Sequence, residues 1–145
     1  MIYLAGDKQG YDAVKIVSDF LDSKRIYYQN LGVKSSSEDL KLEDMIPSVT
    51  KKVLEEENNI GILSCGSGIG VEVGANKFSG IRACLATNEK IAEWAKVYDN
   101  CNILCLVGWN PDKANIEKIV SAFLNSDYDG SEKRLKMFEE FNKWH

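Results

Sequence analysis

The sequence is poor in the residues that build metal and disulfide sites. It contains one histidine, His145 at the C-terminus, and four cysteines, none of which forms a C-x-x-C pair. Zinc sites use closely spaced Cys and His ligands, so this composition argues against a metal centre. In a reducing compartment the cysteines are free thiols, and Cys84 and Cys105, inside apolar runs, are expected to be buried small hydrophobic side chains. We expect His145 to be a frayed end rather than a catalyst.

Long apolar runs are also missing. No run approaches the length that crosses a bilayer, and the first residues lack the basic start and long apolar segment of a signal peptide. We therefore expect a cytoplasmic protein that does not bind membranes. The formal net charge of −4 argues against nucleic acid as the main partner. A chain of 145 residues has room for one ordinary domain with a real core, so we expect a single domain over residues 1–145.

Short apolar runs and helical stripes alternate five times along the chain. The expected strands are residues 1–5, 26–31, 60–63, 81–86 and 103–107. The expected helices cover residues 11–23, about 44–57, 71–77, 88–98, 111–123 and about 131–143. This alternation predicts a three-layer α/β/α sandwich around a mainly parallel sheet with right-handed crossovers.

Ligands of open parallel sheets bind at the carboxyl ends of the strands. The loops that follow the predicted strands should therefore gather into one site. These loops are residues 6–10, 65–70, 87–88 and 108–110.

The loop after the third predicted strand reads Cys65-Gly66-Ser67-Gly68-Ile69-Gly70. Glycines let a backbone turn tightly, so that a row of amide N–H groups faces an anion at the start of a helix. A dinucleotide-binding fingerprint would need glycine where Val71 stands, and the Gly-Lys-Ser/Thr of a Walker loop is absent. A cysteine phosphatase would need an arginine soon after its thiol, and none lies between Cys65 and Arg82. A tight turn with a buried cysteine remains the alternative to a functional site.

Residues 65–83 read C-G-S-G-I-G-x-x-x-x-A-N-K-x-x-G-I-R-A. This run resembles the signature of the sugar-phosphate isomerases of the ribose-5-phosphate isomerase type B and galactose-6-phosphate isomerase family. Similar pieces lie along nearly the whole chain, at Gly6-Asp7, Asn100, Asn102 and the Tyr128-Asp129-Gly130 corner. The resemblance implies a five-stranded Rossmann-like sheet, a dimer with sites at the interface, and no metal or organic cofactor. It also implies the interconversion of an aldose and a ketose phosphate, pentose or hexose, through a cis-enediolate.

The resemblance assigns roles to individual residues. Cys65 matches the family base, and a thiol beside helix-start amides forms a thiolate more readily. Ser67 is expected to donate to the enediolate or to relay a proton. Asp7 matches an aspartate that contacts sugar hydroxyls, although a plain turn residue is the alternative. The expected anion hole consists of the amides of Gly66, Gly68, Ile69 and Gly70.

The chain departs from the family pattern where phosphate and ring oxygen are handled. Lys8 stands where type B ribose-5-phosphate isomerases have a histidine, and Asp99 stands where they carry the ring-opening histidine, just before the substrate-binding Asn100. Glu132 and Lys136 align with two phosphate-gripping arginines. Lys8 and Lys136 would then hold phosphate as point charges without the bidentate fork of arginine. Asp99, or another group, would open the ring.

The tail at residues 128–136 resembles the cysteine-bearing B subunit of galactose-6-phosphate isomerase. That subunit works beside an A subunit that supplies the histidine. The resemblance therefore leaves open a homodimer or tetramer that is active alone and a heteromer with a related subunit. A non-catalytic protein that binds sugar phosphates is the alternative from another functional class.

Overall fold

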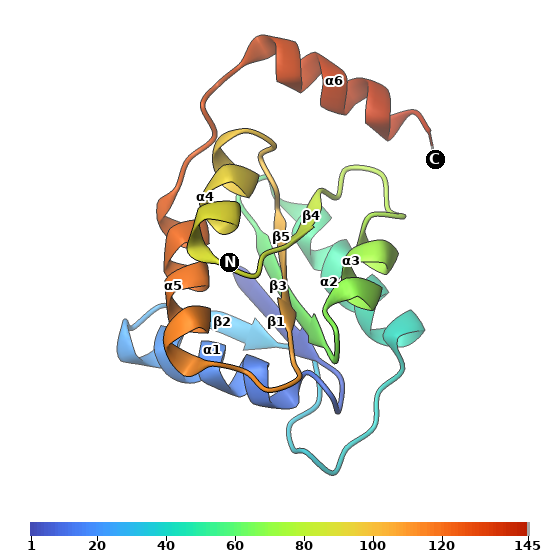
Figure 1. Ribbon diagram of the computed structural model, residues 1–145. Helices are drawn as coiled ribbons and strands as arrows, with labels where there is room; N and C mark the ends of the chain where they lie inside the picture. The colour runs from blue at the N-terminus through green and yellow to red at the C-terminus, as the bar shows by residue number, and fades with distance from the viewer. Residues whose placement is uncertain (145) are drawn as a thin grey trace.

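The computed structural model describes residues 1–144, and His145 lies outside the described residues. Five parallel strands form one sheet in the order β2-β1-β3-β5-β4 (Figure 1). The strands are β1 (Ile2–Gly6), β2 (Tyr28–Asn30), β3 (Ile60–Cys65), β4 (Ala83–Leu85) and β5 (Ile103–Val107). The helices are α1 (Tyr11–Ser23), α2 (Leu42–Glu55), α3 (Ile69–Ala75), α4 (Glu89–Val97), α5 (Lys113–Asn125) and α6 (Glu132–Asn142). The predicted α/β architecture is confirmed.

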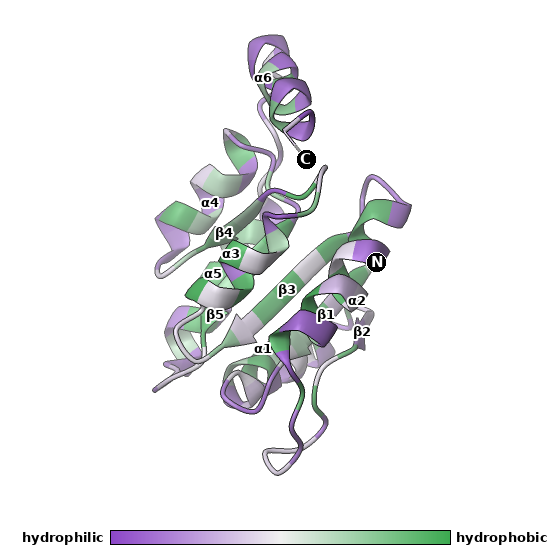
Figure 2. Ribbon diagram, turned by 90° about the vertical axis from the view of Figure 1, so that its right-hand side faces the viewer, coloured by the Kyte–Doolittle hydropathy of each residue, from purple (hydrophilic) through white to green (hydrophobic). Residues whose placement is uncertain are grey.

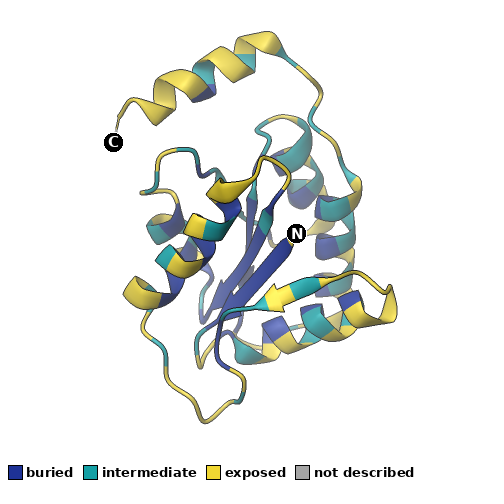
Figure 3. Cartoon of the chain, turned by 180° about the vertical axis from the view of Figure 1, so that it is seen from behind, coloured by how far each residue is buried: buried dark blue, intermediate teal, exposed yellow. Residues whose placement is uncertain are grey.

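Helices cover both faces of the sheet because successive side chains of a buried strand point to opposite sides. On one face, Leu4 of β1 and Leu104 of β5 pack with α1, α4 and α5. On the other face, Ala5 of β1 and Cys105 of β5 pack with α2 and α3. The central strands are buried on both sides and form the middle of the core (Figure 3).

Two edge strands are shorter than their apolar runs predict. β2 and β4 each span three residues, and none of these residues is fully buried.

The helix after β3 begins earlier than predicted. α3 starts at Ile69, two residues before the predicted start. Gly68 precedes it with a φ of +76°, a left-handed conformation that glycine adopts without strain. The amides of Ile69 and Gly70 therefore belong to the first turn of α3.

Helix α6 lies outside the three layers, beyond the amino ends of the strands (Figures 1 and 2). Most of its residues are exposed, but Phe138 is only 6% exposed. Asn142 at the end of α6 accepts the amide of Gly80 at 3.0 Å, and the Arg82 guanidinium lies 5.2 Å from the centre of the Phe138 ring. These contacts hold α6 at its middle and at its C-terminal end. Within residues 1–144, no helix is long and apolar enough to cross a membrane.

Candidate active site

Cys65 is the last residue of β3, and its side chain faces the layer of α2 and α3. β3 lies between β1 and β5, so the loop that follows Cys65 leaves from the middle of the sheet. Cys65 is 5% exposed. Gly68 turns the chain, and α3 starts one residue later. The structure thus places a thiol beside backbone amides at the start of a helix, as the sequence predicts.

The loops after β1, β3 and β5 meet in direct backbone contact. The Gly108 amide donates to the carbonyl of Cys65 at 2.8 Å. A Cβ on Gly10 would lie 2.1 Å from the carbonyl oxygen of Ser64, and one on Gly108 would lie 2.4 Å from that of Gln9. Only glycine allows backbones to approach this closely. The predicted meeting of these loops is therefore found, and it explains the glycines within them.

Asp7 and Ser67 both make hydrogen bonds inside their own loops. One carboxylate oxygen of Asp7 accepts the amides of Gln9 at 3.0 Å and Gly10 at 2.9 Å, which fixes the turn after β1. The hydroxyl oxygen of Ser67 accepts the Ile69 amide at 3.1 Å. The Ile69 amide therefore has a partner within the loop. Lys8 is exposed beside this turn.

Sequence reasoning missed Trp109, which follows β5. Its indole N–H donates to the side-chain oxygen of Gln9 at 3.1 Å. A Cβ on Gly66 would lie 2.3 Å from a carbon of the indole, so the ring rests directly on this glycine. The chain separation of Gln9 and Trp109 is 100 residues, and no local pattern indicates such a contact.

The other predicted site residues lie at the opposite end of the strands, at their amino ends. Asp99 and Asn100 precede β5, and Lys136 is an exposed residue of α6. Cys65 pairs with Val107 at the carboxyl end of β5, whereas β5 begins at Ile103. Four residue steps at about 3.3 Å each separate these two levels by about 13 Å. A single chain therefore does not bring Cys65 together with Asp99, Asn100 or Lys136.

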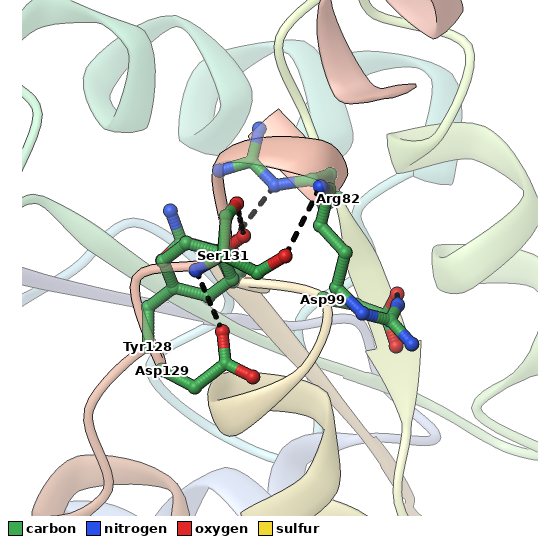
Figure 4. Close-up of polar contacts among 7 residues, drawn as sticks. Arg82, Asp99, Tyr128, Asp129 and Ser131 are labelled. Carbon is green, nitrogen blue, oxygen red and sulfur yellow. Dashed lines mark hydrogen bonds and ion pairs between the residues drawn. The ribbon is translucent and has the colours of Figure 1, made fainter. Parts of the chain in front are cut away.

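Asp99, the predicted ring-opening residue, is a half-exposed side chain held in an ion pair. Its carboxylate accepts a bond from Arg134 of α6 at 3.0 Å, with side-chain exposures of 51% for Asp99 and 40% for Arg134. Arg82 donates to the Asn100 carbonyl at 2.9 Å on the same side (Figure 4). The sequence analysis does not predict this pair.

The predicted Tyr128-Asp129-Gly130 corner sets the start of α6. The Tyr128 hydroxyl donates to the carbonyl of Ser131 at 2.6 Å, and the Asp129 carboxylate accepts the Ser131 amide at 2.9 Å (Figure 4). Ser131 in turn caps the helix by accepting the Arg134 amide. The corner therefore orients the helix that carries Lys136.

An apolar groove of about 550 Å³ lies at the open edge of β4, between α3, α4 and α6. Its walls include the exposed Trp94 and Trp144 and the half-buried Cys84, and Asp99 lies at its side. The Arg82 guanidinium also lines the groove, and burial lowers the pKa of this residue. An exposed apolar groove bordered by charged groups is typical of a protein interface.

A model of the Ribose/Galactose Isomerase family matches residues 2–138. The chain belongs to this family. A probable ribose-5-phosphate isomerase B of Mycoplasma genitalium is 37% identical over 131 residues, which are 89% of this chain and 86% of the relative. The galactose-6-phosphate isomerase subunit LacB of Clostridium acetobutylicum is 36% identical over 81 residues, 56% of this chain and 47% of the subunit.

Solved structures of the family superpose closely on this chain. The ribose 5-phosphate isomerase of Thermotoga maritima gives a TM-score of 0.91 at 30% identity, covering 98% of this chain and 97% of that one. The Mycoplasma genitalium ribose-5-phosphate isomerase B with bound ribulose-5-phosphate gives 0.89 at 31% identity, covering 99% and 94%. The predicted family, fold and class of enzyme, a sugar-phosphate isomerase, are thus confirmed.

The three other thiols of this isomerase lie in surroundings that hold their protons. Burial raises the pKa of Cys84 to about 11 and that of Cys101 to about 12. Burial also raises the pKa of Cys105 well above its usual value. These thiols stay protonated near neutral pH, in keeping with the small hydrophobic role predicted for Cys84 and Cys105, although Cys84 is only partly buried.

Proposed function

We propose that this chain interconverts ribose 5-phosphate and ribulose 5-phosphate, with Cys65 as the base. The observation that carries the proposal is the position of Cys65, at the end of the central strand and next to the first turn of α3. The substrate choice is supported by relatives named as ribose-5-phosphate isomerases B, whose similarity covers more of the chain than that of LacB. A hexose phosphate is the alternative substrate.

In the proposed reaction, the Cys65 thiolate removes the proton from C2 of the open-chain aldose. The electrons form a cis-enediolate, and the Cys65 thiol delivers a proton to C1 after partial exchange with solvent, while the hydroxyl proton moves from O2 to O1. The amides of Gly66, Gly68 and Gly70 stabilise the negative oxygen, a contribution of about 100-fold in rate for each donor. The Ile69 amide, proposed as a fourth donor, instead acts through Ser67. Because the Ser67 oxygen accepts that amide, its own O–H is free to donate to the enediolate.

Substrate binding is assigned to residues at both ends of the strands. The second carboxylate oxygen of Asp7 accepts a sugar hydroxyl, since the first already holds the turn. Lys8 attracts the phosphate as a point charge. Asn100 and Lys136 contact the sugar and phosphate, and Asp99, oriented by Arg134, opens the ring.

These assignments require two copies of the chain, since Cys65 and Asp99 are separated by most of the sheet. We propose a homodimer, with a tetramer as the larger possibility, in which α6 and Asp99 of one copy approach Cys65 of the other. The groove of about 550 Å³ supplies apolar surface for the contact. A heteromer with a related, histidine-bearing subunit is the alternative, and activity of the purified chain alone separates the two.

We also infer a cytoplasmic location. The four cysteines are unpaired thiols, which fits a reducing compartment. Sugar phosphates are likewise intracellular intermediates, so enzyme and substrate would share this compartment. Fractionation of cells into cytoplasmic and envelope material, followed by immunoblotting, tests the inference.

The test is proton NMR in D2O of the purified chain with ribose 5-phosphate, and with hexose phosphates for comparison. We expect solvent deuterium to enter the substrate and ketose to form. Cys65→Ala should abolish both, whereas Cys101→Ala, which removes a buried thiol elsewhere, should leave both intact. Isomerisation that survives in Cys65→Ala would refute the role of Cys65. A folded chain that binds sugar phosphate without exchange would refute the enzyme and favour a binding protein.

A further inference from the structure

The segment after β5 controls how the thiol loop presents its amides. The carbonyl of Cys65 accepts the Gly108 amide at 2.8 Å, and the carbonyl of Gly66 accepts the amides of both Gly108 and Trp109 at 3.0 Å. In a planar trans peptide the N–H points opposite to the C=O. The bonds at residues 108–109 therefore aim the Gly66 and Ser67 amides away from that segment.

Trp109 adds a side-chain lock to these backbone bonds. Its indole occupies the space next to Gly66, with ring atoms 2.3 to 2.7 Å from where a Cβ would be. The indole N–H holds Gln9, two residues after Asp7. One side chain thus joins the loop that carries the thiol to the loop that carries the predicted sugar contact.

The exposure of Trp109 argues against an ordinary core role. The side chain is 58% exposed, although large aromatic rings usually bury most of their surface. The indole instead lies at the site and contacts a loop glycine whose amide is proposed to face the substrate. Loss of this ring removes little core packing but frees the thiol loop to move.

We propose that Trp109 is a positioning residue for the isomerase reaction, which fixes the Gly66 amide and the adjoining thiol through contact with Gly66 and a hydrogen bond to Gln9. Displacement of a reacting group by about 1 Å costs on the order of 100-fold in rate. The inference rests on the proposed function for its kinetic effect, and on the structure alone for the mobility of the loop.

The experiment compares Trp109→Ala with Trp109→Phe, and uses Tyr27→Ala as a control for removal of an exposed aromatic ring at the opposite edge of the sheet. With ribose 5-phosphate, Trp109→Ala should lower kcat by about 30- to 100-fold and change KM by less than about threefold, because the lost interaction acts in the transition state. Trp109→Phe keeps a ring over Gly66 and should restore kcat to within about threefold of the natural chain. Tyr27→Ala should leave both constants unchanged.

A second measurement does not depend on turnover. The alkylation rate of Cys65 by iodoacetamide, followed by peptide mass spectrometry, should rise severalfold in Trp109→Ala and not in Trp109→Phe, with Cys101 as the internal control for global unfolding. A kcat within about twofold of the natural chain in Trp109→Ala would overturn the proposal, as would equal loss in both Trp109 variants. If the natural chain isomerises no sugar phosphate, the proposed function fails, and unchanged Cys65 alkylation in Trp109→Ala would still overturn the positioning role.

Discussion

Alanine at position 66 puts a methyl carbon 2.3 Å from the indole of Trp109. Carbon atoms pack best at about 3.5–4.0 Å, so the ring must move by more than about 1 Å. Because the ring is more than half exposed, it can swing outward, which breaks its bond to Gln9. We expect Gly66→Ala to lower the free energy of unfolding by about 1–2 kcal/mol, the usual cost of moderate overpacking.

Gly10→Ala provides the contrast. Its Cβ would lie 2.1 Å from the oxygen and 2.4 Å from the carbon of the Ser64 carbonyl, which is backbone of the central strand. Neither the backbone of β3 nor the turn after β1 can move aside as an exposed side chain can. We expect this variant to lose at least about 3 kcal/mol, in the range that marks a disrupted core.

The assay is urea unfolding at one protein concentration, since association contributes to the stability of an oligomer. Gly66→Ala is measured in the natural chain and in Trp109→Ala, where the obstructing ring is gone. In that second background we expect a cost below about 0.5 kcal/mol, because the two residues interact directly. An equal cost in both backgrounds, or a Gly10→Ala chain as stable as Gly66→Ala, would refute the steric reasoning.

Three further predictions follow from individual contacts. Because burial raises the pKa of Cys101 from 9.0 to about 12, the folded state holds this proton more tightly than the unfolded chain. Stability is therefore unaffected below pH 9 and falls above it, by about 1 kcal/mol between pH 9 and 10, and Cys101→Ala should flatten that fall in urea unfolding curves. Asp99→Asn should change the free energy of unfolding by less than about 1 kcal/mol, since its ion pair is half exposed, but should lower turnover of ribose 5-phosphate by about 100-fold in steady-state assays. Phe138→Ala removes the one buried side chain of α6, so it should cost about 3 kcal/mol and shift the chain toward the monomer in sedimentation velocity, whereas exposed Lys133→Ala should do neither.

The sheet was predictable because its central strands are continuous apolar runs between amphipathic helices. Residues 60–63 and 103–107 are apolar runs that are too short for buried helices, so they predict buried parallel strands. Both are strands in the structure. The edge strands were predicted too long, because an apolar run does not show where pairing with a neighbour ends. β4 pairs only over Ala83–Leu85, and its outer side is the wall of the groove under α6.

The candidate site was predictable only where it is local. The motif around Cys65 sets its own geometry through a left-handed glycine and a helix start, so residue order carried the information. Trp109 joins the site through a contact with Gln9, and long-range side-chain contacts leave no mark in local spacing. The resemblance grouped Asp99 and Lys136 with Cys65, although one chain holds them at opposite ends of the strands. A linear motif does not record which copy of the chain contributes each residue.

The central claim, that two copies complete one site, is tested most directly by mixing two inactive variants. Cys65→Ala lacks the base. Asp99→Asn/Lys136→Glu lacks the proposed ring-opening carboxylate and phosphate-binding amine near the amino ends of the strands. After the two are unfolded and refolded together, about half of the dimers contain one copy of each, and one of their two sites is intact, so about a quarter of the natural activity should return. Mixed dimers seen by native mass spectrometry without any return of isomerase activity would contradict the account.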